Sequence, residues 1–234
     1  EHHQEPLLDI HRRVGLSGQV VGGEHVEEFE ENCRLLAKRK YAVSVANASD
    51  GLFFALSCAG IGPGDEVLTT AYSFHATAES ISRTGATPVF DDVDDHYHLD
   101  LAIITISENT KAIVVVNLFG NCVNFDAFEV LAKQHNLILF EDAAQSLYSS
   151  WHDTPSGKLG LASVYSFAPS KNIPGFSHGG CVVTDNKDLY NKIKTAKLHG
   201  KENGKHTQIG FNSIMSSFEA AQINYFFKQA HRWQ

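Results

Sequence analysis

The sequence has no excess of basic residues, no long apolar run and no closely spaced cysteines. Lysine and arginine number 19 against 27 acidic residues, for a formal net charge of −8, whereas proteins that bind nucleic acid through bulk charge have the opposite balance. No stretch approaches the roughly 20 uninterrupted apolar residues that cross a bilayer. The four cysteines include no Cys-x-x-Cys pair, so we expect reduced thiols that mostly fill the core. We therefore expect no nucleic-acid partner and no membrane.

The first residues also lack the basic-then-apolar pattern of a signal peptide, which predicts a location in the reducing cytoplasm. The chain is rich in apolar side chains: 43% of its 234 residues are hydrophobic and 20% are charged. This content is enough for a packed core and excludes a disordered or fibrous chain. The length fits one large domain or two small ones.

Short apolar runs alternate with amphipathic stretches from about residue 23 onward. The predicted strands are 41–46, 66–70, 88–91, 112–118, 137–141, 164–167 and 181–184. The predicted helices are 23–39, 51–59, 74–83, 125–135, 187–198 and 218–233. Strands that alternate with helices are typical of a mainly parallel sheet covered on both faces. The predicted fold class is therefore α/β, a three-layer αβα sandwich.

Three units are expected along the chain. Residues 1–22 form an N-terminal segment, residues 23–217 form a large domain, and residues 218–234 form a further helix. That last helix has no C-cap or turn signal after it. We therefore expect it to lead to a smaller C-terminal domain that is absent from the sequence.

Three motifs suggest ligand sites at first sight but lack the right context. The run 60–64, Gly-Ile-Gly-Pro-Gly, follows a helix and precedes a strand, the reverse of the order in dinucleotide-binding loops. The segment 200–206 resembles a P-loop but is one residue short and lacks the Ser or Thr after its lysine. His96 and His98 lie in an acidic loop, where exposed His and Asp side chains are commonly just solvated. We predict no metal site.

Three polar segments carry the candidate chemistry, although each has an ordinary alternative. The segment 47–51 joins a strand to a helix, and the N–H groups at a helix N-terminus suit a phosphate as well as a simple N-cap. Glu141 and Asp142 end a predicted strand at the edge where α/β folds bind ligands, unless they are only a polar strand end. Lys171 follows the strand 164–167 and is well placed for a Schiff base, although most lysines are solvated surface groups.

Taken together, the three segments predict a particular kind of cofactor site, which none of them predicts alone. A phosphate cradle, a carboxylate and a later lysine are what pyridoxal phosphate needs. Beyond this pattern, the chain from about residue 24 to residue 222 resembles the large domain of the DegT/DnrJ/EryC1/StrS family of sugar aminotransferases, a branch of the fold-type I pyridoxal-phosphate enzymes. The matching segments are 47–52, 60–67, 74–78, 85–93, 141–145, 166–172, 179–184 and 209–213.

The resemblance implies roles for the residues around the ring of pyridoxal 5'-phosphate. Lys171 matches the lysine that binds the cofactor as an imine and then moves a proton. Asp142 matches the carboxylate that keeps the pyridine nitrogen protonated, so that the ring can accept electrons. Gln145 matches a hydrogen-bond partner near the ring hydroxyl, while Ala144 and Phe74 match residues on the two faces of the ring.

The resemblance also implies a phosphate site and a partner subunit. Ser49 and Asp50 would supply backbone groups, and Ser166 a hydroxyl, to the cofactor phosphate. Asn212 matches an asparagine that reaches the phosphate bound by the neighbouring subunit, which implies a homodimer.

Three positions depart from the family pattern. His178 stands where an acidic residue is usual, Ile214 where an arginine is common, and Ala48 within the usually glycine-rich phosphate turn. Lys171 is present, whereas a branch of the family that dehydrates sugars has histidine there. The retained lysine favours transamination.

The predicted function is a pyridoxal-phosphate-dependent aminotransferase that passes an amino group from glutamate or glutamine to a nucleotide-linked keto-sugar in amino-sugar biosynthesis. The alternative is a family member with impaired catalysis that binds the cofactor and acts through its dimer surface. His178, Ile214 and the absent small domain favour this alternative, whereas Lys171 and Asp142 oppose it. A nicotinamide oxidoreductase on a similar sheet lacks a usable glycine fingerprint.

Overall fold

A seven-stranded sheet forms the centre of the computed structural model, which describes residues 3–230. In spatial order its strands are β1 (Tyr41–Val45), β9 (Gly180–Thr184), β8 (Ala162–Ser166), β5 (Ile138–Asp142), β4 (Thr110–Val116), β2 (Glu66–Thr70) and β3 (Thr87–Asp91). The strands from β8 to β3 pair in parallel, whereas β9 is antiparallel to both β8 and β1. The sheet is mainly parallel, which confirms the prediction.

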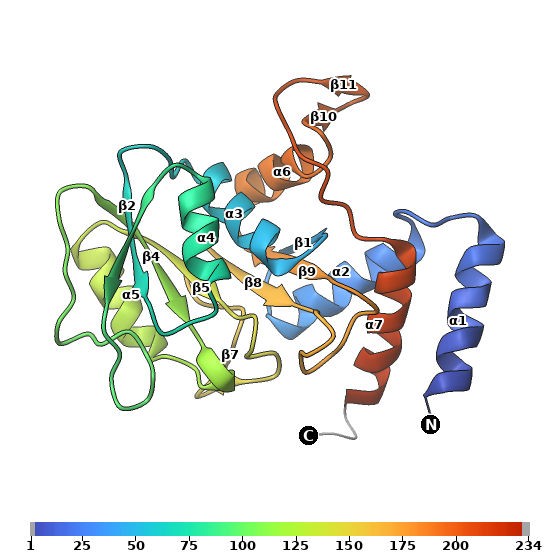
Figure 1. The fold of residues 1–234 in the computed structure, drawn as a ribbon, viewed down its shortest axis with the longest axis horizontal. Coiled ribbons are helices and arrows are strands. Elements are labelled where there is room, and N and C mark those ends of the chain that lie inside the picture. Colours follow the sequence, from blue (N-terminus) through green and yellow to red (C-terminus); the bar gives the residue numbers. More distant parts are fainter. Residues whose placement is uncertain (1–2, 231–234) are drawn as a thin grey trace.

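Helices cover both faces of this sheet (Figure 1). One face carries α3 (Ala48–Cys58), α4 (Ala76–Arg83) and α6 (Lys187–Ala196); the other carries α2 (Glu24–Leu36), α5 (Phe125–Gln134) and α7 (Ser217–Gln229). Alternation along β1 divides the apolar side chains between the two cores, because Val43 and Val45 face α3 and Ala42 faces α2. This arrangement confirms the three-layer αβα sandwich.

Side-chain caps set where several helices begin. Asn47 Oδ1 accepts the N–H of Asp50 at 2.8 Å, and Asn124, Asn186 and Ser216 cap α5, α6 and α7 in the same way. Because Asn47 is the cap, α3 begins at Ala48. The segment expected as a turn before residue 51 is therefore the first turn of the helix.

Both ends of the described chain add a helix to the same side of the sheet. The N-terminal segment forms α1 (Gln4–Ser17), which the sequence analysis did not predict, and α1 lies beside α7 (Figure 1). Its Val14 is only 2% exposed. The helix expected over 218–233 is α7, which ends at Gln229, and residues 231–233 lie outside the described residues. The division into three units stays a prediction.

Two short hairpins and a helical turn lie outside the main layers. The hairpin of β6 (Ser150–Trp151) and β7 (Thr154–Pro155) follows β5, and η1 (Leu118–Gly120) follows β4. The hairpin of β10 (Lys201–Glu202) and β11 (Lys205–His206) follows α6 and projects away from the body (Figure 1). Within residues 3–230, no helix combines the length and apolar character needed to cross a membrane.

Candidate active site

A cavity of about 510 Å³ opens at the carboxyl ends of the central parallel strands. This is the edge where open α/β sheets bind ligands. Val116, Asp142 and Ser166, the last residues of β4, β5 and β8, all line it. The remaining lining residues are Asn47, Ala48, Ser49, Leu52, Ser73, Phe74, Ala76, Ser80, Ala144, Gln145, Ala168, Ser170, Lys171, His178 and Gly179.

The cavity brings together most of the residues expected at the site. Its wall includes seven of them: Ser49, Phe74, Asp142, Ala144, Gln145, Ser166 and Lys171. Asp50 and Asn212 are not part of the wall. The two central groups, Asp142 and Lys171, come from segments that are adjacent only because β5 and β8 pair in parallel.

Asp142 is held by two donors from different elements. The hydroxyl of Thr77 donates to Oδ2 at 2.8 Å, and the amide of Ala144 donates to Oδ1 at 3.1 Å. Ser73 lies 2.9 Å from the Thr77 hydroxyl and extends this chain of hydrogen bonds. Burial raises the pKa of the Asp142 carboxyl, while the bonds from Thr77 and Ala144 and the charge of Lys171 partly oppose that rise. The carboxylate is thus oriented by a hydrogen bond to each of its oxygens.

The adjacent carboxylate, Glu141, serves a different purpose. Strand alternation turns it to the opposite side of β5, where it is fully buried. It accepts hydrogen bonds from the side chains of Asn117, Ser156 and Ser163 and from the amides of Gly157 and Leu159. Of the two carboxylates that end the predicted strand, only Asp142 faces the cavity.

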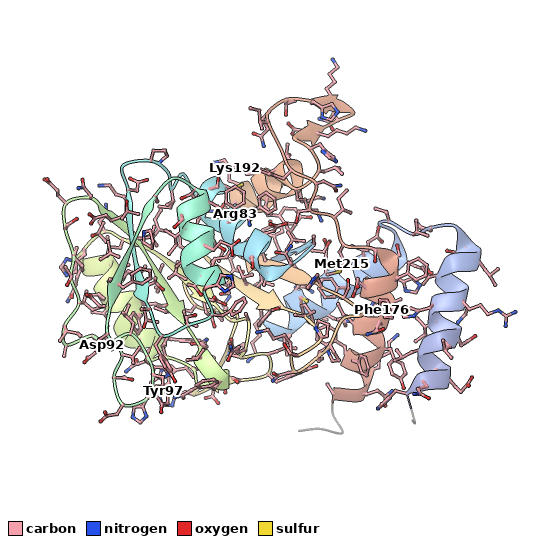
Figure 2. All side chains as sticks on the ribbon, in the orientation of Figure 1. Arg83, Asp92, Tyr97, Phe176, Lys192 and Met215 are labelled. Carbon is pink, nitrogen blue, oxygen red and sulfur yellow. The ribbon has the colours of Figure 1, made fainter. Side chains whose placement is uncertain are left out.

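Hydrogen bonds to Glu219 of α7 hold the loop that carries Lys171. The carboxylate of Glu219 accepts the amides of Phe176 at 2.6 Å and Ser177 at 2.8 Å, and the Ser177 hydroxyl at 2.7 Å. Phe176 packs edge-on against His11 of α1, with ring centroids 5.2 Å apart (Figure 2). The sequence analysis missed Glu219, because a glutamate in the first turn of a helix is ordinary.

The turn at the start of α3 lies directly above the first residue of β9. A Cβ on Gly180 would come within 2.5 Å of the Asn47 carbonyl carbon and 2.7 Å of the Ala48 nitrogen. Ser49 and Ser166 line the cavity at this end. A helix N-terminus with two hydroxyl groups beside it suits an anion.

Asp50 lies on the far side of that turn. Its amide donates to Asn47, and its carboxylate accepts the Ser213 hydroxyl at 2.7 Å and pairs with Arg83 at 2.9 Å. These contacts connect the turn at the start of α3 to α4, through Arg83, and to the segment before α7, through Ser213. A direct contact from Asp50 to a phosphate stays a prediction.

Phe74 and Gln145 both line the cavity. Phe74 is 61% exposed, and its ring packs against that of His75. Gln145 Oε1 accepts the amide of Phe119 at 2.8 Å, which fixes its side chain against η1. The ring of Tyr97, in the loop after β3 (labelled in Figure 2), packs edge-on against that of Phe119.

Asn212 is exposed and is not among the residues that line the cavity of its own chain. A β-bridge joins it to Leu198, and the neighbouring Phe211 packs on Phe53 and Phe54. Among residues 3–230, no three His, Cys, Asp or Glu side chains are grouped so that they could hold a metal ion.

Comparison with known proteins places these features in a family. Residues 4–234 match the model of the DegT/DnrJ/EryC1/StrS aminotransferase family. The chain is 37% identical over 231 residues to a "Pleiotropic regulatory protein" of Geobacillus stearothermophilus, covering 97% of this chain and 62% of that protein. It is 36% identical over 214 residues to the UDP-2-acetamido-2-deoxy-3-oxo-D-glucuronate aminotransferase of Pseudomonas aeruginosa, covering 90% and 60%.

Solved structures show the same fold. DesV of S. venezuelae, determined in complex with a ketimine intermediate, has a TM-score of 0.95 at 31% identity, covering 99% of this chain and 63% of that one. NtdA of Bacillus subtilis with bound cofactor PMP has a TM-score of 0.90 at 27% identity, covering 97% and 53%. The chain thus spans between about half and just over three-fifths of the length of these relatives.

Proposed function

Because the chain belongs to the DegT/DnrJ/EryC1/StrS aminotransferase family, we propose that it acts as a pyridoxal 5'-phosphate-dependent aminotransferase. Its amino donor would be glutamate or glutamine, and its acceptor a nucleotide-linked keto-sugar. The observation that carries the proposal is the single cavity that joins Asp142 and Lys171 to the N-terminus of α3. The Pseudomonas relative, named for a keto-sugar linked to UDP, supports the acceptor class.

The donor set of the cavity fits the cofactor. The turn 47–49 and the Ser166 hydroxyl would hold the phosphate at the positive end of α3. Asp142, pre-oriented by Thr77 and Ala144, would hold the proton on the pyridine nitrogen. The fit is chemically specific, because an ionised carboxylate favours a cationic N–H over a neutral ring nitrogen.

The ring itself would lie between Phe74 and Ala144. Phe74 offers an exposed aromatic face on one side, and the small Ala144 leaves room on the other. Gln145 would reach the ring hydroxyl, since its Oε1 is already anchored by Phe119. These contacts would orient the ring relative to Lys171 and exclude water from its faces.

The bound cofactor supplies an electron-accepting pyridinium ring and a carrier for the amino nitrogen. The chain supplies the groups that move and hold protons. Lys171 Nζ would attach the cofactor and then carry a proton between the reacting carbon atoms. Asp142 would remain ionised and keep the ring nitrogen protonated throughout.

A homodimer is part of the proposal. Asn212 does not reach its own cavity, and Ile209 beside it is 92% exposed. The adjacent hairpin of β10 and β11 projects from the body. This placement supports a contact from Asn212 to the phosphate bound by a partner subunit. A cytoplasmic location stays a prediction from the sequence.

One observation favours a second function, a cofactor-binding protein with impaired catalysis. The Geobacillus relative is named as a regulatory protein, and Ile214 stands where the family resemblance implies an arginine. The two functions differ in one measurable step. A catalyst loaded with cofactor changes its visible absorbance when glutamate donates its amino group, whereas a binding protein does not.

Covalent labelling tests the assignment of the site. We expect borohydride treatment of the cofactor-loaded protein to fix the label on Lys171, as read by peptide mapping. Lys171→Ala should lose the label, while Lys192→Ala, which changes an exposed lysine of α6, should keep it (Figure 2). A label on another lysine would overturn the assignment, and a labelled protein inert toward both donors would favour the second function.

A further inference from the structure

The cavity has few positive groups for a ligand rich in negative charge. Among its described lining residues, only Lys171 and His178 have side chains that can carry a positive charge. Arg83 lies nearby but is committed elsewhere, because its guanidinium pairs with Asp50 at 2.9 Å and covers the Phe53 ring at 4.5 Å. If Lys171 is used to attach the cofactor, His178 is the remaining side chain among the described lining residues that can carry a positive charge.

The backbone on both sides of His178 is fixed. On one side, Glu219 accepts the amide and hydroxyl of Ser177 at 2.8 and 2.7 Å. On the other, the carbonyl of Gly179 accepts the amide of Phe167 at 2.8 Å, which joins this segment to the end of β8. Glu219 is itself only 8% exposed. His178 therefore extends from an anchored segment, so little backbone ordering is needed when a ligand binds.

The imidazole of His178 is not used inside the chain. Within residues 3–230 its ring nitrogens have no hydrogen-bond or ion-pair partner, although the residue lines the cavity. His11 differs, because its ring packs against Phe176 and Phe218. An exposed imidazole without a partner, on an anchored segment and lining the same cavity as Lys171, is suited to a small anionic ligand.

We propose that His178 binds the α-carboxylate of the amino-acid donor and so fixes the donor for reaction beside Lys171. This inference rests on the proposed function. The α-carboxylate is the group that glutamate and glutamine share, and it is attached to the carbon that carries the amine.

Binding without turnover gives the sharpest test. The ligand is α-methylglutamate, which has no α-hydrogen to lose, and its Kd is read from the absorbance of the cofactor-loaded protein. The comparison ligand is 4-aminobutyrate, which keeps the amine and the distal carboxylate of glutamate but lacks the α-carboxylate. We expect His178→Gln to weaken α-methylglutamate about 10-fold or more, the usual range for a hydrogen bond to a charged group, and to leave 4-aminobutyrate unchanged.

Two further variants test charge rather than folding. His178→Arg should restore the affinity for α-methylglutamate to within about 3-fold of the parent, and His178→Glu should bind it most weakly. His135→Gln, at an exposed histidine after α5, is the matched control and should match the parent. All variants should keep the parent's affinity for the cofactor, because His178 lies outside the segments assigned to the phosphate and the ring.

The outcomes separate this inference from the proposed function. If the parent binds α-methylglutamate and reacts with glutamate but His178→Gln does the same, the role of His178 is wrong and the function stands. Equal weakening of both ligands would place His178 on the distal carboxylate or on the fold, and would also refute the inference. A cofactor-loaded parent that neither binds nor reacts with either donor would refute the proposed function itself.

Discussion

The hydroxyl of Thr77, on α4, donates a 2.8 Å hydrogen bond to Oδ2 of Asp142, at the end of β5. Thr77 is only 1% exposed, and its hydroxyl also lies 2.9 Å from that of Ser73. The bond favours the ionised carboxylate and so opposes the rise in pKa that burial causes. Thr77 thereby orients the carboxylate assigned to the cofactor nitrogen and favours its ionised form.

Replacing Thr77 by valine should shift the pH dependence of the reaction with glutamate. Without the hydroxyl, the pKa of Asp142 rises further, so less of the carboxylate is ionised at a given acidic pH. The rate of the absorbance change, plotted against pH, falls on the acidic side as Asp142 takes up a proton. In Thr77→Val this fall should lie at higher pH by roughly half a unit to one unit. Thr77→Ser keeps the hydroxyl and is the control. A fall at the parental pH in Thr77→Val would show that this bond does not tune Asp142.

Asp142→Asn should alter the pH dependence of stability in the cofactor-free protein. Burial raises the folded pKa of Asp142 above its unfolded value, so the folded state binds the proton more tightly. This tighter proton binding stabilises the folded protein fully at pH values below the pKa of Asp142 in the unfolded chain. The stabilisation is lost as the pH rises through the pKa of Asp142 in the folded protein. Measured from about pH 4 to pH 8, the Tm of the parent should therefore fall relative to that of the variant.

The same variant should lose most of its reaction with glutamate. Asparagine can accept from Thr77 but has no negative charge with which to hold a protonated ring nitrogen. We expect the rate to fall about 10²-fold or more, as when other preorganised electrostatic groups are removed. A parental rate in the loaded variant would exclude the role assigned to Asp142.

Gly180→Ala should weaken cofactor binding. The new Cβ would lie 2.5 Å from the carbonyl carbon of Asn47, so the turn at the start of α3 would have to move. Overpacking of this kind costs about 1–3 kcal/mol, which corresponds to a Kd raised roughly 5- to 150-fold. Gly62→Ala is the control, because its Cβ would meet nothing closer than 3.8 Å. Equal affinities in the two variants would show that this turn does not form the phosphate site.

Local patterns were enough to predict the layers and the two central groups of the cavity. Apolar runs such as 112–118 and 137–141 identified strands, and positions after predicted strands pointed to Asp142 and Lys171. The family resemblance, rather than local pattern, pointed to the other five expected residues that line the cavity: Ser49, Phe74, Ala144, Gln145 and Ser166. The sequence analysis missed α1, because its position depends on packing against α7, about 200 residues later in the chain.

Contacts between distant segments account for the other differences. Nothing near Thr77 or Glu219 in the sequence indicates that their side chains reach Asp142 and the Lys171 loop. The backbone of Asp50 was expected at the phosphate, which stays a prediction, but nothing in the sequence indicated that its carboxylate pairs with Arg83 and Ser213. Such pairings follow from how helices pack on the sheet, which short-range spacing does not specify.

Glu141→Gln should destabilise the fold. Each carboxylate oxygen of Glu141 accepts at least two hydrogen bonds, and an amide nitrogen in place of one oxygen would face buried donors such as the Leu159 amide. One unsatisfied buried donor costs about 1–3 kcal/mol, which lowers Tm by roughly 2–12 °C for a chain of this size. Glu129→Gln, at an exposed position on α5, should leave Tm unchanged.

Mixed subunits provide the last prediction, which concerns Asn212. If its side chain acts on the phosphate bound by the partner subunit, Asn212→Ala chains and Lys171→Ala chains should each be impaired alone. A mixed dimer would then hold one site with both defects and one with neither, since a twofold interface repeats the same contact.

Activity should therefore reappear on mixing, up to about a quarter of the parental value: random exchange makes half of the dimers mixed, and each has one intact site. Affinity tags on the two chains would verify that mixed dimers form. If verified mixed dimers stay inactive, Asn212 acts within its own subunit or not at all. A monomer in solution that still binds the cofactor tightly would also argue against a shared site, because the exposed position of Asn212 leaves it outside the cavity of its own chain.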